Sequence, residues 1–373
     1  MFFLPTTKVG PTILSFILWI LLIWATPAMA QEPSSQAQGL TSPEPVRIYR
    51  NPEERREAGL GKKITEWLKF GGVIELEKER KKNKIKGKDN TEDPDTELAI
   101  ELGFEVEYDD WLEAEVLFAI EDNGRRHYQE LDEGLVGVNL GEWGLKVGRL
   151  YVPFGAYYSH FIEGPLLEFG QTRGDAVLMD YTFLDSIELA AYVFDSKVDR
   201  RENHNEVDWG VNVEYVSEDE SIRIGAGYIS DLSESEEEIL FDFNNNFLRR
   251  VPAWNAYALI GMQSFEFTAE ILRATHAFQE FPKETDQPFA YNLELAYFPL
   301  ESVQVSVRGE HSEELEDEPA WQYGISGTWA IWENVTVSVD YLYGRYKERF
   351  AFDDFDNAQI SHHQSALQLT WGF

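Results

Sequence analysis

The stretch TELAIELGFEVEY, residues 96–108, alternates between apolar and polar side chains. The apolar parity carries Leu98, Ile100, Leu102, Phe104, Val106 and Tyr108. The polar parity carries Glu97, Glu101, Glu105 and Glu107. Because successive side chains of a β-strand point to opposite faces, this pattern predicts a strand with one apolar and one acidic face. Half-buried strands of soluble sandwiches alternate too, so the rest of the chain must decide the fold.

Segments of this kind recur from residue 66 to Phe373, and we count sixteen of them. The links between them alternate between short turns and long loops. An even number of strands long enough to cross a bilayer, with short turns at one end and long loops at the other, is typical of bacterial outer-membrane barrels. We therefore predict an all-β fold, a transmembrane antiparallel β-barrel of about 16 strands over residues 64–373.

The segments before the barrel fit an exported protein. Lys8, the apolar run 13–24 and the small residues Ala28-Met29-Ala30 predict a signal peptide over residues 1–30. Residues 31–63 are polar and rich in proline, which predicts a periplasmic linker. The terminal pattern Leu367, Leu369, Trp371, Phe373 resembles the signal that outer-membrane proteins present to their assembly machinery, so we expect that machinery to bind Phe373. The expected location is the outer membrane of a Gram-negative bacterium.

Composition excludes several classes of function. The chain has 373 residues, a formal net charge of -35 and no cysteine. The charge excludes binding to a nucleic-acid backbone, and the lack of cysteine excludes a thiol nucleophile and a thiolate metal centre. The histidines show no zinc spacing, and the acidic segment Asp231 to Glu238 lacks the spacing of an EF-hand calcium loop. We predict no cofactor, no specific metal site and no enzymatic activity.

A barrel of sixteen strands encloses a channel, and the polar parity of its strands faces that channel. We therefore predict an acidic lumen wall made of Glu97, Glu101, Glu105, Glu113, Glu115, Glu266 and Glu270. Rings of carboxylates favour cations or the cationic parts of a solute. General acidity that serves solubility is the alternative interpretation.

The third long connection, residues 152–173, is rich in aromatic residues and poor in charge. An exposed loop is normally polar, so this one is expected to fold inward and narrow the channel, as the third loop of trimeric porins does. The expected constriction or solute-contacting residues, in this loop and just before it, are Arg149, Tyr151, Tyr157, Tyr158, His160, Glu163 and Arg173. A loop that only packs on the rim is the alternative.

A basic run, Lys78 to Lys88, stands out in this acidic chain. With the first strand expected over residues 66–78, the run forms the first extracellular loop, residues 79–94. Outer-membrane lipid and lipopolysaccharide are expected partners of the barrel, and this run could pair with lipopolysaccharide phosphates. A simply solvated loop is the other interpretation.

Several motifs resemble the LbtU-type siderophore porin family. They are the stretch VGRLYVPFGAY from Val147, the pair Ser159-His160, Gly170-Gln-Thr-Arg173, FGGVIELE over 70–77 and the segment from Asp132. The resemblance implies passive uptake of iron–siderophore complexes through an outer-membrane channel. Two alternatives stay open: a general or cation-preferring porin, and a barrel-anchored surface-binding protein. The oligomeric state is open as well, although many sixteen-stranded porins are trimers.

Overall fold

The structure is a computed structural model that describes residues 62–85, 88–91, 94–122, 127–196, 198–200, 207–235, 246–247, 249–281, 283, 285–315, 317–332, 334–347 and 358–373. The predicted signal peptide, residues 1–30, and nearly all of the predicted linker lie outside these residues. From the linker, only Lys62 and Lys63 are described, as the short strand β1 (Lys62–Lys63), which pairs with β2.

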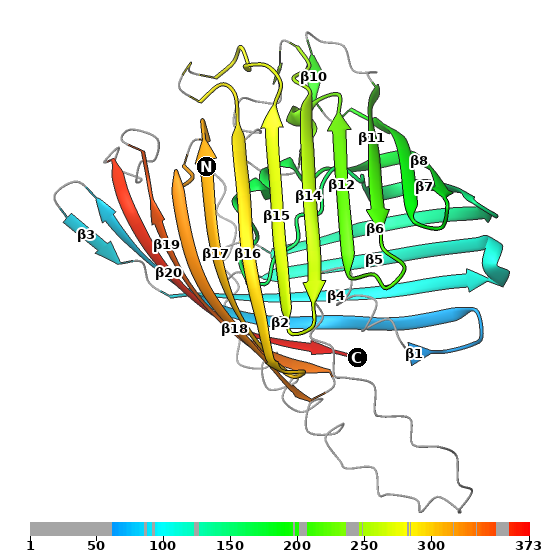
Figure 1. Ribbon diagram of the computed structural model, residues 1–373, viewed down its shortest axis with the longest axis horizontal. Coiled ribbons are helices and arrows are strands. Elements are labelled where there is room, and N and C mark those ends of the chain that lie inside the picture. Colours follow the sequence, from blue (N-terminus) through cyan, green and yellow to red (C-terminus); the bar gives the residue numbers. More distant parts are fainter. Residues whose placement is uncertain are drawn as a thin grey trace, which may run out of the picture. The chain divides into compact units, whose positions relative to one another are not determined.

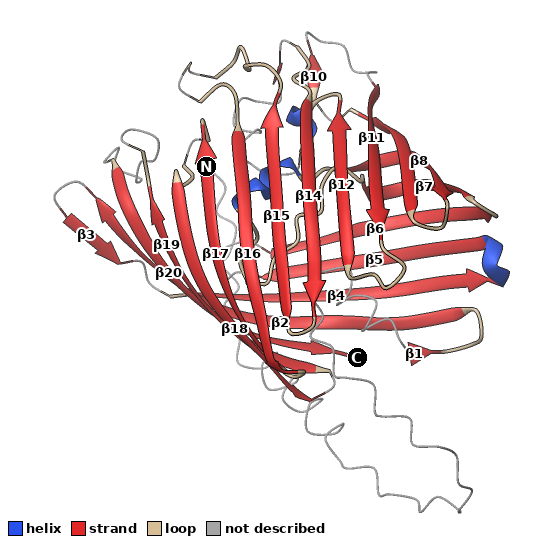
Figure 2. Ribbon diagram, viewed as in Figure 1, coloured by secondary structure: helices blue, strands red, loops and turns tan. Residues whose placement is uncertain are grey.

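Sixteen long antiparallel strands form a closed barrel, as predicted (Figures 1 and 2). Each strand pairs with the next, and β20 pairs with β2 to close the ring. The barrel strands are β2 (Leu68–Ile85), β4 (Asp95–Tyr108), β5 (Leu112–Asp122), β6 (His127–Leu140), β7 (Trp143–Tyr151), β8 (Arg173–Phe183), β9 (Ile187–Asp195), β11 (Val207–Val216), β12 (Ile222–Ile229), β14 (Ala253–Met262), β15 (Phe265–Ala274), β16 (Phe289–Leu300), β17 (Val303–Glu313), β18 (Trp321–Trp332), β19 (Val335–Arg345) and β20 (Gln359–Gly372).

The smaller elements lie in the connections. They are the strands β3 (Lys88–Thr91), β10 (Asp199–Arg200) and β13 (Asn246–Phe247), and the 3-10 turns η1 (Asp109–Trp111), η2 (Leu166–Gly170) and η3 (Leu232–Glu234). None of the helices in the described part of the chain is long and apolar enough to span a membrane.

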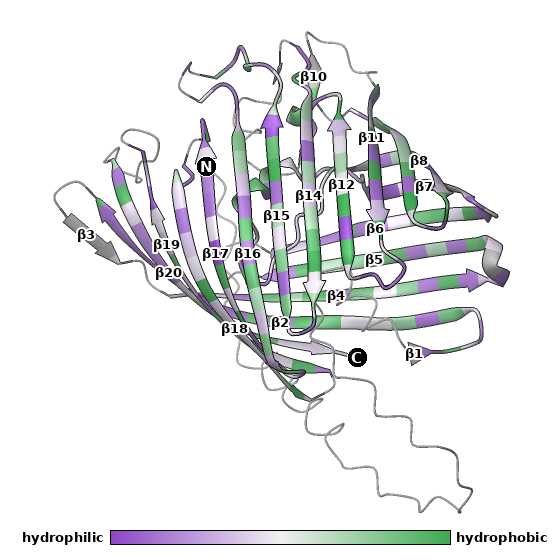
Figure 3. Ribbon diagram, viewed as in Figure 1, coloured by the Kyte–Doolittle hydropathy of each residue, from purple (hydrophilic) through white to green (hydrophobic). Residues whose placement is uncertain are grey.

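The strands alternate in polarity along their length, as Figure 3 shows by its purple and green bands. The apolar parity is exposed on the outside of the barrel, for example at Phe104, Phe118 and Phe265. Exposed aromatic residues near strand ends, such as Trp209 and Trp329, lie where the two interfacial girdles of a membrane barrel are expected. The sixteen-stranded ring therefore presents an apolar surface to lipid and a polar surface to its interior.

Two predicted loops are shorter than expected, because the flanking strands extend further. β2 continues to Ile85, so most of the basic run is strand and not loop. Its register places Lys78 opposite Leu367 and Lys84 opposite Ser361 of β20. β6 likewise begins at His127, although the polar residues 122–130 predict a second long loop there. In both cases the polar composition suggested a loop, but backbone pairing with a neighbouring strand is compatible with any exposed side chain.

The barrel makes a direct stability prediction at the middle of β4. Leu102 faces outward there, whereas Ala99 faces the interior beside Glu75. Replacing Leu102 by lysine should lower the free energy of unfolding by about 2–4 kcal/mol, because a charge then faces the hydrocarbon core. The measurement is urea unfolding of the protein in lipid vesicles. The matched variant Ala99→Lys should change stability much less, and equal effects at the two positions would contradict the assigned faces.

Candidate functional site

The loop between β7 and β8, residues 152–172, runs inside the barrel and is called loop 3 below. It is held against the far wall by carboxylates that the strands point inward. Glu270 of β15 accepts hydrogen bonds from the backbone N–H groups of Ala156 at 2.9 Å and Tyr157 at 2.8 Å. The Asn255 side chain donates to the same carboxylate at 2.8 Å. The expected inward fold of the loop is therefore present, and its first anchor is a wall carboxylate.

His160 is the most enclosed part of this contact, with 0% of its side chain exposed. Its Nδ1 lies 2.9 Å from Glu294 Oε2, and its Nε2 lies 3.3 Å from Glu266 Oε1. Glu294 also accepts from the backbone N–H of His160 at 2.8 Å and from the Ser159 hydroxyl at 2.8 Å. The Tyr158 hydroxyl donates to Glu266 at 2.6 Å. Both imidazole nitrogens face carboxylates, so the pair Ser159-His160 has the geometry of an anchor and not of a nucleophile and its base.

Arg308 of β17 holds the middle of loop 3. Its Nη1 donates to the backbone oxygens of Glu163 at 2.9 Å and Gly164 at 3.2 Å. Its guanidinium lies over the ring of Phe161, 4.4 Å from the ring centroid. Glu294 and Glu310 flank it at 3.6 and 3.0 Å. This buried arginine thus balances part of the negative charge that the wall carries against the loop.

The strand β19 and the next part of loop 3 complete the contact. Ile162 N–H donates to Asp340 Oδ2 at 2.5 Å, and Leu166 N–H donates to Glu310 at 2.7 Å. Glycines of the wall permit this close approach. A Cβ at Gly227 would lie 2.4 Å from the backbone oxygen of Phe154, and one at Gly324 would lie 2.6 Å from the Phe161 ring.

An apolar core fills the barrel mouth on the side of loop 3. Phe154, Leu167 and Phe169 of the loop pack there with side chains from the walls and from the other long loops. This packing resembles the interior of a soluble protein more than a channel. Water and solutes are therefore restricted to the part of the lumen that loop 3 leaves uncovered.

That uncovered part follows β2, β4 and β5 and continues toward β9, β11 and β12. Two inward arginines show the difference: the Arg223 side chain is 47% exposed, whereas that of Arg308 is 0% exposed. Inward carboxylates on this side are exposed or half-buried, and these are Glu75, Glu77, Glu97, Glu101, Glu105, Glu107, Glu113, Glu115, Glu121 and Glu188. The inward bases of the same region are Lys69, Lys81, Lys146 and Arg223, each paired with a glutamate. The accessible interior surface is thus strongly negative.

Three carboxylates meet where loop 3 comes opposite the uncovered wall. Glu163 of the loop interacts electrostatically with Glu77 of β2 and Glu97 of β4. Gln364 of β20 donates a hydrogen bond to Glu163 and fixes its position. We call Glu77, Glu97 and Glu163 the acidic triad. Like charges in proximity repel one another, which favours a bound proton or a cation between them, so this set attracts positive solutes when it is ionised.

The structure separates the predicted solute-contacting residues into different environments. Tyr158 and His160 are buried between loop and wall and anchor the loop, and the Tyr157 side chain packs against the apolar core, so none of the three reaches the passage. Of the predicted solute-contacting residues within loop 3, only Glu163 lines the passage. Of the predicted acidic wall, Glu97, Glu101, Glu105, Glu113 and Glu115 line the accessible side. Glu266 and Glu270 face inward as predicted, but they are covered by loop 3.

The remaining three candidates lie at the start and end of loop 3. Arg149 is on the outward parity with exposed Val147, and its Nε lies 3.6 Å from Asp175, so its expected place in the constriction is wrong. Lys146 is the inward residue of β7 and lies 3.1 Å from Glu113. Tyr151 and Arg173 are opposite each other in the ladder, and the Arg173 guanidinium binds Glu130 and Asp132 of β6. They fix the base of the loop.

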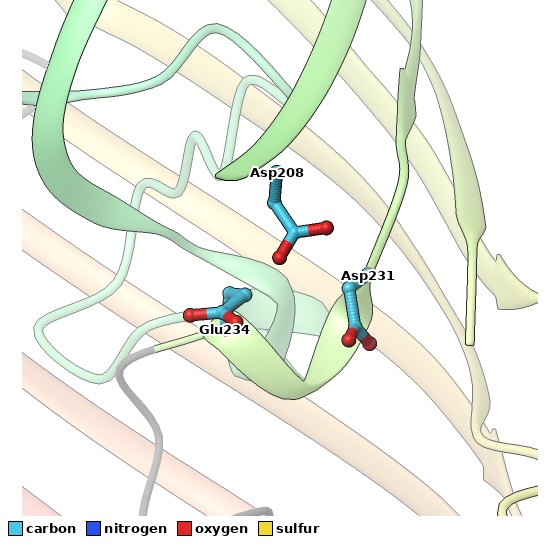
Figure 4. Close-up of side chains that lie close together, drawn as sticks. All are labelled: Asp208, Asp231 and Glu234. Atoms are coloured by element: carbon cyan, nitrogen blue, oxygen red, sulfur yellow. The ribbon is translucent and has the colours of Figure 1, made fainter. Parts of the chain in front are cut away.

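One carboxylate group elsewhere has the geometry of a hard-cation site. Asp208, Asp231 and Glu234 are buried near the long-loop end, and one oxygen of each lies within 4.8 Å of the others (Figure 4). Oxygen ligands of this kind suit Ca²⁺. However, Asp208 already accepts from Arg250 at 2.6 Å and from Ser230 at 2.7 Å, and Asp231 accepts from two backbone N–H groups. These four bonds fall on one oxygen of each aspartate, Asp208 Oδ1 and Asp231 Oδ1.

Comparison with known proteins agrees with the fold. No family model matches the chain. A UPF0422 protein of Coxiella burnetii (strain RSA 493 / Nine Mile phase I) is 30% identical over 165 residues, which are 40% of this chain and 35% of that protein. The chain therefore matches only about a third of the length of this relative.

Solved porins superpose on most of the chain. The anion-selective porin from Comamonas acidovorans has a TM-score of 0.61 at 9% identity and covers 82% of this chain and 100% of its own. The outer membrane channel DcaP of Acinetobacter baumannii gives 0.56 at 10% identity, covering 84% and 99%. Salmonella typhi OmpF, in a complex with daunomycin, gives 0.56 at 13%, covering 82% and 98%. At these identities the likeness shows the fold, an outer-membrane barrel of the porin type.

The anchors of loop 3 predict the effect of a single substitution. His160→Ala removes one partner of a buried ionic contact and leaves Glu266 and Glu294 without it, which should cost about 3–5 kcal/mol at the anchor. Loop 3 should then detach in part, and single-channel conductance in planar bilayers should rise with increased current noise. The exposed His276→Ala variant provides the control. An unchanged conductance for His160→Ala would show that the remaining contacts hold the loop alone.

The same anchor predicts a pH dependence. Burial disfavours the charged imidazolium, but the hydrogen bonds to Glu266 and Glu294 outweigh it and raise the pKa of His160. The charge-assisted contact is thus fully present below the ordinary histidine pKa of about 6.5 and is lost as pH rises through the raised value. Noise from loop motion should increase over that alkaline range in the native protein. The His160→Ala variant should show no such step.

Proposed function

We propose that the protein is a passive outer-membrane channel whose acidic passage selects solutes of neutral or positive charge. The porin-type barrel supports the channel. The observation that carries the selectivity is the contrast between the two halves of the lumen: loop 3 covers the inward carboxylates of β15, β16 and β17, whereas those of β2, β4 and β5 stay accessible. Permeating ions would therefore pass a wall of glutamates opposite Glu163.

Within this class we propose iron–siderophore complexes as solutes, on the resemblance of the motifs around residues 70–77 and 147–173. The acidic passage adds a restriction that the resemblance does not supply. A ferric complex of net negative charge would face the acidic triad and be repelled, because carboxylates with little counter-charge attract cations. The expected complexes are neutral or cationic. Passive passage through such a channel would follow the concentration gradient.

The location and maturation follow from the same proposal. Residues 1–30 act as the export signal, residues 31–63 as a periplasmic linker, and Phe373 as a contact of the assembly machinery. In the folded barrel Phe373 exchanges backbone hydrogen bonds with Gly72 at 3.0 and 3.1 Å, so its backbone lies in the seam between β20 and β2. A recognition role would therefore precede closure of this seam.

Charge removal at the acidic triad tests the selectivity. The variant Glu77→Gln/Glu97→Gln/Glu163→Gln should lower the ratio of K⁺ to Cl⁻ permeability severalfold, because it removes three neighbouring carboxylates that line the passage. The measurement is the reversal potential in a KCl gradient across a planar bilayer. The control Glu142→Gln/Glu218→Gln/Glu301→Gln removes equal charge from exposed turns. A ratio that falls equally in both variants would attribute the selectivity to general charge.

The solute class is tested with two ferric complexes of similar size and opposite charge. A cationic trihydroxamate complex should interrupt the single-channel current, and an anionic tris-catecholate complex should not. If neither complex interrupts a cation-selective current, the protein is a cation-preferring porin and the siderophore proposal is wrong. If the anionic complex alone interrupts it, the proposed role of the acidic passage is wrong.

A further inference from the structure

The basic run that the channel does not use lies on the outer surface of the barrel. Along β2, the outward-facing residues are apolar up to Leu76 and basic from the next outward position, Lys78. Leu68, Phe70, Ile74 and Leu76 precede Lys78, Arg80, Lys82 and Lys84 on the same face. Leu76 is exposed to lipid, and Lys78, Arg80 and Lys82 are exposed directly beyond it. In the described strands, β2 alone repeats basic residues at successive outward positions.

The depth of these residues can be estimated from strand geometry. Leu68 to Leu76 rises about 27 Å along the strand, which is about 20 Å along the membrane normal at a tilt of about 40°. This length nearly spans the apolar band of about 25 Å that outer-membrane barrels present. Since β2 begins at the short-turn end, Lys78 and the residues after it lie at the headgroup level of the outer leaflet.

Neighbouring strands mark the same level independently. The register places Arg80 opposite Ser365 and Lys82 opposite His363 of β20. β19 continues these rows with Tyr341 and Tyr343. The Tyr341 hydroxyl lies 2.7 Å from His363 Nδ1, and the Tyr343 ring lies 5.0 Å from the His363 ring. Aromatic groups of this kind collect at the membrane interface, so the basic residues beside them are at phosphate depth.

We propose that Lys78, Arg80 and Lys82, the basic stripe, bind the phosphate groups of lipid A in the outer leaflet. Alternate strand residues are about 7 Å apart, so three cations offer a row of donors to a glycolipid with separated phosphates. Ser365 beside Arg80 is small and leaves room for a headgroup. Lys84 is excluded from the stripe, because its register partner in β3 is Asp89. The proposal is independent of the solute that the channel carries.

The test compares binding of the full refolded protein to three lipids. Lipid A with both phosphates, lipid A from which the phosphates have been removed, and phosphatidylglycerol are added to the protein in detergent, and bound lipid is counted by native mass spectrometry. The native protein should retain intact lipid A most strongly. Lys78→Gln/Arg80→Gln/Lys82→Gln should weaken that binding about a hundredfold, since each cation near an anionic surface contributes about fivefold.

The control Arg249→Gln/Lys283→Gln/Lys347→Gln removes the same charge from the loops and should bind lipid A as the native protein does. Heat-dependent migration on gels and channel conductance verify that both variants are folded barrels. Equal binding by the stripe variant and the control would overturn the proposal. So would equal retention of dephosphorylated lipid A, or retention of phosphatidylglycerol in preference to lipid A.

Discussion

The arrangement of the lumen depends on buried carboxylates that accept hydrogen bonds from the backbone of loop 3. Glu270, Glu294, Glu310 and Asp340 would be costly to bury alone, and the loop backbone would be equally costly without acceptors. Each satisfies the other, with His160 and Arg308 supplying counter-charge. This mutual requirement fixes loop 3 against one wall, and by doing so it leaves the opposite wall open. The position of the passage and its acidity are both consequences.

The sequence predicts the fold well because its dominant signal is local. The parity of residues 96–108 is visible in any window of a dozen residues, and the phase of short and long connections carries it around the whole ring. Strand ends are predicted less well. Composition predicts a loop for the basic run, but β2 continues through it because β20 pairs with one edge up to Ile85 and β3 pairs with the other edge from Lys82 to Ile85. Pairing between residues nearly 300 positions apart leaves no local trace.

The same reasoning explains the mixed result for the site. Parity correctly places Glu101 and Glu270 in the interior, yet only the path of loop 3 decides that one is accessible and the other covered. His160 and Tyr158 looked like solute contacts because they are polar and aromatic, but those properties serve equally well in an anchor. Glu310 and Gln364 escaped notice, since their roles arise from a loop about 150 or more residues away. Arg149 was misplaced because a bulky cation on an outward face contradicts the usual pattern, and Asp175 makes it tolerable there.

The seam between β20 and β2 has a consequence for how the barrel is made. Its register runs from Val73 opposite Gly372 to Ile85 opposite Gln359, which is the full length of β20 and most of β2. These are the strands most distant in sequence, so bringing them together costs more loop-closure entropy than any hairpin does. The hydrogen bonds of the long ladder between β2 and β20 offset that entropy cost, and they form together in a single cooperative event. Until it forms, two unsatisfied strand edges remain, so closure of the ring should be the slow step of insertion, and the intermediate before it the state most prone to aggregate.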